Sequence, residues 1–360
     1  MLKHLMAEII DRCNYRCNMC TIWTHQGPEL DLVLLEKFLK SPYCAGMESI
    51  GITGGEPMMF SKLSELAAIL NKLDNIKTIY ISSNGWFKDR LLKFVEEFPN
   101  KQVNVNISID GLKEMHNQIR GIESFDRAVE TLKELTVQKA VGELGIVYPS
   151  LQDNSHMNGT DFPKAPGKNR KGSTGIKMTV QRKNIGEILG LYKFAKSLKV
   201  YFSLMPVVSS PAYFNNVSEV DDISVNPGTS DGDRFLTVLK ELHKHYRTPY
   251  IDMLMEMYSG KWRNMDIYRC LFPEENNMIY PDGTLGVCFL TDRLDVKAYL
   301  ADFENYEKKN PEFRALAKTE LLATDCKTCP ASCAGNYKLS FLSELIGRIQ
   351  NKILSLDQFS

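Results

Sequence analysis

The sequence lacks a net charge and a long apolar run. Lysine plus arginine number 44 and aspartate plus glutamate also number 44, so the chain is formally neutral. Proteins that bind nucleic acid or a membrane surface over a broad face are usually basic, and this balance argues against both classes. No apolar stretch reaches the roughly 18 residues that a transmembrane helix needs, so we expect no membrane span.

The sequence also lacks a signal peptide and an even set of cysteines. The first apolar stretch is short and contains His4, Glu8 and Asp11, which a signal peptide would not tolerate. The nine cysteines are odd in number and clustered, unlike a secreted disulfide framework. Clustered cysteines in a reducing compartment favour metal sites. We therefore predict a cytoplasmic protein with metal-bound cysteines.

Apolar stretches of strand length alternate with amphipathic stretches of helical length over residues 5–205. Strands are expected at Leu5–Ile10, Glu48–Ile52, Ile76–Ile81, Val103–Ile109, Ile176–Val180 and Tyr201–Met205. Helices are expected at Asp31–Lys40, Ser61–Leu73, Phe87–Phe98, Ser124–Val137 and Ile185–Leu198. Six β/α repeats predict an α/β fold, with a parallel sheet curled into a partial or complete barrel. Its chemistry would lie in the loops that follow the strands.

Three cysteines follow the first predicted strand with the spacing C-x3-C-x2-C. They are Cys13, Cys17 and Cys20. Three thiolates on one loop can bind three irons of a cubane cluster and leave the fourth iron open. A zinc site is the alternative, but it would need a fourth ligand, for which His25 is the nearby candidate.

The stretch Thr53-Gly54-Gly55-Glu56-Pro57 follows the second predicted strand. Its two glycines would let the backbone approach a ligand, and its glutamate and carbonyls could receive an ammonium group. Together with the cysteine spacing, this stretch resembles the radical S-adenosylmethionine (radical SAM) family. The resemblance covers Met6 to about Pro206 and implies a partial (β/α)6 barrel over residues 1–206. It also implies a SAM-binding [4Fe-4S] cluster on the three cysteines.

The resemblance implies SAM contacts at the ends of the second, third and fourth predicted strands. The SAM amino group is expected at Gly54, Gly55, Glu56 and Pro57. The methionyl end is expected near Ser82, Ser83 and Asn84, and the ribose near Ser108 and Asp110. Arg120 is expected either to bind the SAM carboxylate or to form a surface salt bridge. Met19 stands where the family usually has an aromatic residue, and its thioether could pack beside adenine.

Residues 138–175 interrupt the repeat with a long segment rich in glycine, proline and polar residues. Connections in such folds are usually only a few residues long. We interpret this insertion as a disordered surface loop, because it offers few apolar groups to bury. The alternative is a lid that orders over an anionic substrate, since Lys164, Lys168, Arg170 and Lys171 make its second half basic.

After Pro206 we expect a linker with helices over 207–265, at Asp233–Tyr246 and Tyr250–Tyr258. The spacing C-x12-G-x4-C from Cys270 to Cys288, around a Pro-Asp-Gly turn, resembles the opening of the auxiliary-cluster domains called SPASM and twitch. The resemblance implies such a domain over 266–335, with one [4Fe-4S] cluster. Its expected ligands are Cys270, Cys288, Cys326 and Cys329.

Cys333 is then either a spare thiol or a replacement for one of the last two ligands. A four-cysteine zinc site is the alternative, because spacing alone does not separate zinc from iron. Residues 336–360 are expected to contain an amphipathic helix that packs on the core.

The resemblance implies a reaction as well as a fold. A donor such as flavodoxin or ferredoxin would reduce the first cluster. SAM would then be cleaved to methionine and a 5′-deoxyadenosyl radical that abstracts hydrogen from an unactivated C–H bond. A second, thiolate-ligated cluster could accept the electron left on the substrate. This favours an oxidoreductase that dehydrogenates a small hydroxylated metabolite, as in the twitch enzymes of aminoglycoside assembly.

Two other functions stay open. A ribosomal-peptide maturase could form a cross-link or epimerise a residue, but many such enzymes carry a leader-binding domain, for which we expect no room before Leu5. An electron-transfer protein with two clusters is the non-enzyme alternative. Such a protein needs no amino-acid pocket, so the Thr53–Pro57 motif argues against it.

Overall fold

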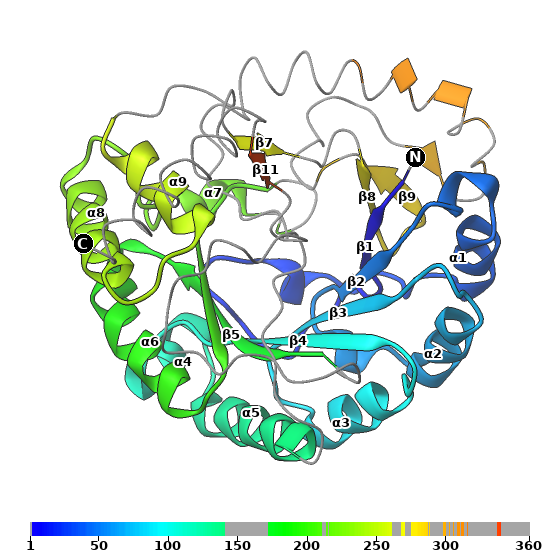
Figure 1. Ribbon diagram of the computed structural model, residues 1–360, viewed down its shortest axis with the longest axis horizontal. Helices are drawn as coiled ribbons and strands as arrows, with labels where there is room; N and C mark the ends of the chain where they lie inside the picture. Colours follow the sequence, from blue (N-terminus) through cyan, green and yellow to red (C-terminus); the bar gives the residue numbers. More distant parts are fainter. Residues whose placement is uncertain are drawn as a thin grey trace, which may run out of the picture.

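In the computed structural model the described residues are 2–140, 172–210, 214, 216–260, 268–270, 275–286, 288, 298–299, 302, 305, 308–309, 311–312, 315 and 337–339. Strands alternate with helices, and the strands form a curved sheet with helices along its outer side (Figure 1). The strand order in this sheet is β10-β9-β8-β1-β2-β3-β4-β5-β6.

The central strands and the helices between them follow the predicted repeat, except that α4 was not predicted. The strands are β1 His4–Glu8, β2 Ser49–Thr53, β3 Thr78–Ser83, β4 Gln102–Ser108, β5 Thr174–Val180 and β6 Tyr201–Pro206. The helices are α1 Leu32–Leu39, α2 Leu63–Asn71, α3 Lys88–Glu96, α4 Lys113–Arg120, α5 Phe125–Ala140 and α6 Ile188–Ser197. Neighbouring strands from β1 to β6 are all parallel, so their carboxyl ends meet at one rim. The predicted α/β fold with a parallel sheet is confirmed.

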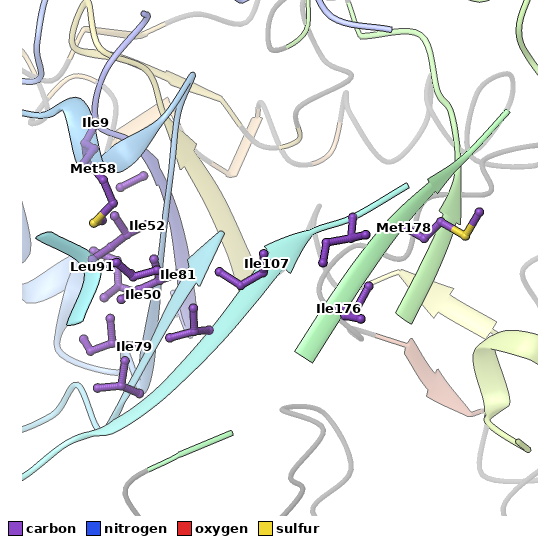
Figure 2. Packing of buried hydrophobic residues seen from close by; sticks show 14 of the residues in the cluster. Ile9, Ile50, Ile52, Met58, Ile79, Ile81, Leu91, Ile107, Ile176 and Met178 are labelled. Atoms are coloured by element: carbon purple, nitrogen blue, oxygen red, sulfur yellow. The ribbon is translucent and has the colours of Figure 1, made fainter. Parts of the chain in front are cut away.

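Side chains alternate along each central strand between the outer helices and the barrel interior. Apolar residues on the outer side are buried against the helices, as Figure 2 shows for Ile50, Ile52, Ile79 and Ile81 beside Leu91 of α3. The inward side is polar at most positions of β3 to β6, namely Tyr80, Ser82, Asn104, Asn106, Ser108, Lys177, Thr179, Tyr201 and Ser203. The barrel interior is therefore suited to a polar ligand rather than to a closed apolar core.

Local signals explain where two of these helices begin. Asp31 caps α1, because its carboxylate accepts hydrogen bonds from the backbone N–H groups of Val33 and Leu34. The predicted helix over 185–198 is divided in the structure. A 3-10 helix covers Arg182–Glu187, where Gln181 and Asn184 form a reciprocal capping box, and α6 follows it.

The second half of the described chain contains α7 Val217–Val220, α8 Ser230–His243, α9 Pro249–Tyr258, β7 Tyr268–Cys270, β8 Asn276–Ile279, β9 Thr284–Gly286, β10 Ala298–Tyr299 and β11 Tyr337–Leu339. The predicted hairpin around the Pro-Asp-Gly turn is present as the antiparallel pair β8–β9. Strand β8 also pairs in parallel with β1 and so extends the barrel sheet. No helix among the described residues is both long and apolar enough to cross a membrane.

Several predictions from the sequence fall outside the described residues. These are residues 141–171 of the insertion expected at 138–175, the cysteines Cys326, Cys329 and Cys333, and most of the helix expected within 336–360. The ends of that insertion instead belong to α5 and β5. Cys270 lies in β7, which pairs antiparallel with β11, and Cys288 is buried.

Candidate functional site

A cavity lies at the rim where the carboxyl ends of the central strands meet. The predicted site residues that line it are Cys13, Cys17, Met19, Cys20, Gly54, Gly55, Ser82, Ser83, Asn84, Ser108 and Arg120. The structure thus gathers residues from the cysteine loop, from the loop after β2, from the end of β3 and the residue after it, and from β4 and α4. Three predicted residues, Glu56, Pro57 and Asp110, do not line the cavity.

The cysteine loop presents its sulfurs to hydrogen-bond donors. The backbone N–H of Tyr15 donates to Cys13 Sγ at 3.4 Å, and the Arg120 guanidinium donates to Cys17 Sγ at 3.7 Å. Burial raises the pKa of all three thiols, that of Cys20 to about 12. A thiol of this kind loses its proton when a metal replaces it, and the donors then stabilise the bound thiolate.

The zinc alternative for this loop finds no support in the geometry. Within the part of the chain that the structure describes, no three His, Cys, Asp or Glu side chains converge closely enough to hold one ion. His25, the predicted fourth ligand, does not line the cavity, and its Nδ1 lies 2.9 Å from Asp11 Oδ1. A cubane cluster places each cysteine on a different iron and does not need that convergence.

Three glycines let neighbouring backbone pack directly against the cysteine loop. A Cβ on Gly54 would lie 2.5 Å from Ile10 O, and one on Gly55 would lie 2.1 Å from Arg12 O. Gly121, at the end of α4, has a φ of 68°, and its Cβ would lie 2.4 Å from Arg16 O. The sequence analysis expected Gly54 and Gly55 to admit a ligand. In the structure their missing side chains also admit the backbone of the loop that carries the cysteines.

Glu56 lies behind the cavity and not in it. Its side chain is fully buried, and its carboxylate accepts hydrogen bonds from Ser83 Oγ at 2.8 Å and from the Asn84 N–H at 2.7 Å. Burial raises the pKa of Glu56 to about 7, although these hydrogen bonds oppose the shift. Glu56 thus holds Ser83 and Asn84, which do line the cavity, whereas its expected contact with the SAM amino group stays a prediction.

Arg120 is buried, at 8% exposure, so the alternative of a surface salt bridge is wrong. Its Nε lies 2.5 Å from Oδ2 of Asp110, which is fully buried and also accepts a hydrogen bond from the Thr179 N–H. The Asp110 carboxylate is thus engaged by protein groups, and its expected contact with the ribose stays a prediction. The Asp110 N–H in turn donates to His116 Nδ1, and burial lowers the pKa of that histidine to about 3.

Several cavity residues were missed in the sequence. Lys177 and Thr179 of β5, Met205 of β6 and Met278 of β8 line the cavity, as does Asn216. The period-two alternation of β5 carried a usable signal, because Lys177 and Thr179 lie on the side opposite the buried Ile176 and Met178. Nothing in the sequence indicated that β8 pairs with β1.

Comparison with known proteins identifies the fold and the family of this site. Residues 7–142 match the model of the radical SAM superfamily. The chain carries a radical SAM domain. The GTP 3′,8-cyclase of Aquifex aeolicus is 32% identical over 112 residues, which cover 29% of this chain and 35% of that protein. The GTP 3′,8-cyclase of Pasteurella multocida is 32% identical over 147 residues, covering 38% of this chain and 42% of that protein.

Solved structures share this radical SAM fold at low sequence identity. Streptococcus suis SuiB, solved with its precursor peptide SuiA, has a TM-score of 0.58 and 15% identity, covering 84% of this chain and 63% of SuiB. The protein anSMEcpe, solved with AdoMet and the peptide Kp18Cys, has a TM-score of 0.59 and 18% identity, covering 88% of this chain and 83% of that one. The matches to the cyclases span well under half of those proteins, so they indicate the domain and not the reaction.

The radical SAM family implies a [4Fe-4S] cluster and SAM, and the residues present fit both. The three cysteines share one cavity and meet N–H donors. Thr53 and the two glycines bring backbone to the same cavity, and Ser82, Ser83, Asn84 and Ser108 add polar groups to its wall. The match over residues 7–142 confirms the expected radical SAM domain, whereas the role of each residue and the auxiliary cluster stay predictions.

Proposed function

We propose that this radical SAM enzyme removes hydrogen from a small, polar metabolite held inside the barrel. When bound at the cysteine loop, the cluster and SAM supply a reductively formed 5′-deoxyadenosyl radical. The chain's own residues then have three tasks: they hold the cluster and SAM, they position the substrate, and they keep water away from the radical carbon. Net oxidation, a dehydrogenation, is the proposed outcome.

Binding of the cluster and SAM falls to the rim. Cys13, Cys17 and Cys20 are the proposed iron ligands, with Tyr15 N–H and Arg120 as donors to sulfur. Backbone of Thr53–Gly55 is proposed to accept the SAM amino group, because these residues line the cavity whereas Glu56 does not. Ser83 and Asn84, both held by the Glu56 carboxylate, are proposed to contact the methionyl end.

The polar barrel interior supports a small polar substrate. Register aligns Ser108 of β4 with Lys177 of β5, and Lys177 with Ser203 of β6, so two hydroxyls flank one amine on neighbouring strands. Lys177 and Ser108 line the cavity. An ammonium group beside hydroxyls can bind a carboxylate or phosphate and hydrogen bond to nearby substrate hydroxyls. This row is the observation that carries the proposal.

A peptide substrate is the second candidate. SuiB and anSMEcpe were solved with peptides, and their folds cover most of this chain. Their low identity supports the fold alone, so the peptide function remains the alternative. The third alternative, an electron-transfer protein with two clusters, would not need a row of polar side chains that faces the barrel interior.

The test is anaerobic reconstitution with iron and sulfide, followed by reduction with dithionite in the presence of SAM. We expect 5′-deoxyadenosine to form, and we expect none from a variant with Cys13, Cys17 and Cys20 all changed to Ala. Incubation with a panel of hydroxylated carboxylates and sugar phosphates should then give a product two hydrogens lighter. A reconstituted protein that never cleaves SAM would refute the proposal. If it modifies peptides but none of the small molecules, the substrate is a peptide and not a small metabolite.

A further inference from the structure

The cavity at the rim has an apolar side that the proposed function does not use. Met6 of β1 and Met278 of β8 line it, and the register places them directly beside each other on neighbouring parallel strands. Met278 is almost fully buried, at 1% exposure, and Met6 is partly buried. A thioether is only a weak hydrogen-bond acceptor, so this pair forms an apolar wall. The residues that line the cavity from β2 to β5 are, in contrast, all polar.

The backbone of β2 makes room for this wall. Gly51 is level with Met6 in the register of β1 and β2, and a Cβ on Gly51 would lie 2.6 Å from Met6 Sδ. The Met6 thioether therefore lies over the position where any other residue would carry a side chain. Because Gly51 has none, Met6 packs against the β2 backbone and lines the cavity without filling it.

The polar side of the cavity lies across the barrel from the two methionines. Lys177 and Thr179 line the cavity from β5, and three strands, β2, β3 and β4, separate β5 from β1 in the sheet. In Figure 1 β1 and β8 accordingly lie on one side of the curved sheet and β5 lies on the other. The cavity thus offers an ammonium group on one side and two thioethers on the opposite side.

This wall is separate from the apolar residues expected beside adenine. The family resemblance places adenine near Met19, which packs with Ile119 and Val207 in a hydrophobic cluster of its own. Among the described residues, that cluster includes neither Met6 nor Met278. Met278 also comes from the β8–β9 hairpin, far along the chain from the cysteine loop. The wall is therefore available to a group other than SAM.

We propose that Met6 and Met278 hold an apolar arm of the substrate, which makes the substrate a small amphipathic anion. Its carboxylate or phosphate faces Lys177, and its alkyl group faces the two thioethers. This inference rests on the proposed function and adds the part of the substrate that the polar row does not recognise. Methionine suits this task because its side chain is apolar, unbranched and adaptable in shape. Each methylene buried against the wall strengthens binding, whereas a hydroxyl in its place would lose its hydrogen bonds to water.

Calorimetric titration tests the apolar arm without turnover. The reconstituted enzyme, with its cluster oxidised and SAM present, is titrated anaerobically with lactate, 2-hydroxybutanoate and 2-hydroxyhexanoate, which share one head group. We expect the dissociation constant to fall about fourfold for each added methylene. Gluconate has as many carbons as 2-hydroxyhexanoate but carries hydroxyls along its chain, and it should bind more weakly.

Substitutions in the wall should change this dependence on chain length. Met278→Gln and Met6→Gln keep the length of the side chain and add an amide, so each should flatten the dependence, whereas Met278→Leu should retain it. Gly51→Ala should displace the Met6 thioether and weaken binding of 2-hydroxyhexanoate more than binding of lactate. Met255→Gln is the matched control, because Met255 is partly buried on α9 and does not line the cavity, and it should bind the series as the unaltered enzyme does.

An unaltered enzyme that does not bind 2-hydroxyhexanoate, or binds the series without regard to chain length, would overturn the inference. A loss of SAM affinity in the glutamine variants as large as their loss for 2-hydroxyhexanoate would overturn it too, because the wall would then serve SAM. Gly51→Ala leaves both thioethers in place, so it tests the wall if a glutamine variant does not fold, and equal weakening of lactate and 2-hydroxyhexanoate would count against the wall. Failure of the unaltered enzyme to cleave SAM with dithionite would instead refute the proposed function.

Discussion

Arg120 and Asp110 form a buried ion pair, with 2.5 Å between Nε and Oδ2. The pair joins α4 to the end of β4, and Asp110 also accepts the Thr179 N–H of β5 at 2.7 Å. Arg120 in turn reaches Cys17 Sγ. The Asp110 carboxylate therefore holds the Arg120 guanidinium in position beside the cysteine loop, and the pair stabilises the arrangement of residues at the rim.

Replacing Asp110 by Asn should destabilise the iron-free protein by about 3–5 kcal/mol, because it leaves a buried guanidinium without its counter-charge. Urea denaturation followed by circular dichroism measures this loss. The double change Asp110→Asn with Arg120→Met should recover part of it, since both charges are then absent. A loss below about 1 kcal/mol in the single variant would mean that water or another group satisfies Arg120.

The glycine contacts predict a contrast between two Gly→Ala changes. Gly55→Ala would put a Cβ 2.1 Å from Arg12 O, so it should push the Thr53–Pro57 loop away from the cysteine loop. We expect lower stability and weaker SAM binding by equilibrium dialysis. Gly190→Ala is the matched control, because Gly190 lies inside α6 and its Cβ would meet only Leu112, at 3.7 Å.

The control should stabilise the protein by about 0.5–1 kcal/mol through helix propensity. Equal effects of Gly55→Ala and Gly190→Ala would show that the close approach to Arg12 is not required.

Much of the fold could be predicted from the sequence because the strands are short apolar runs separated by amphipathic helices. Ile50 and Ile52, or Ile79 and Ile81, show this pattern directly. Helix α4 was missed because its sequence, Lys113–Arg120, is largely polar and has few apolar residues to mark a period. The pairing of β8 with β1 was also missed, since a contact between segments so far apart leaves no local trace.

The residues of the candidate site also differ in how much about them can be predicted from the sequence. Cys13 and Ser83, which line the cavity, stand at motif positions: the first was proposed from the cysteine spacing and the second from the family resemblance. Glu56 and Asp110 stand at motif positions too, but their carboxylates face neighbouring protein groups, and a sequence does not show which way a carboxylate points. Their burial and their hydrogen bonds are properties of the packed structure.

The titration of Glu56 predicts a pH dependence of stability. Its folded-state pKa of about 7 exceeds the value of 4.5 expected for an exposed glutamate. The stability contribution is therefore fully present below pH 4.5 and is lost as the pH rises through 7, by up to about 3 kcal/mol. Denaturation of the iron-free protein at pH 5 and pH 8 measures the difference. Glu56→Gln should show a smaller decrease over this interval, and an equal decrease would assign the pH effect to other groups.

Iron content tests the predicted auxiliary cluster. Reconstituted protein should hold about eight irons per chain, from two four-iron clusters. Changing Cys13, Cys17 and Cys20 to Ala should remove about half of them, and changing Cys270 and Cys288 should remove the other half. Zinc in place of the second half, found by elemental analysis, would support the four-cysteine zinc alternative. If the protein dehydrogenates its substrate with only the first cluster present, net oxidation does not require the second cluster.

Lys177 provides the sharpest test of the substrate class. Lys177→Met keeps the length of the side chain and removes its charge, so SAM cleavage with dithionite should persist while product formation falls about 100-fold for an anionic substrate. Lys177→Arg should retain more activity, because a cation remains beside Ser108 and Ser203, although its fork differs from an ammonium. The diagnostic quantity is the ratio of product to 5′-deoxyadenosine, since loss of substrate positioning uncouples the two. A variant that loses SAM binding together with product would assign Lys177 to the SAM carboxylate. Unchanged coupling in Lys177→Met would show that the substrate carries no anionic group at this row.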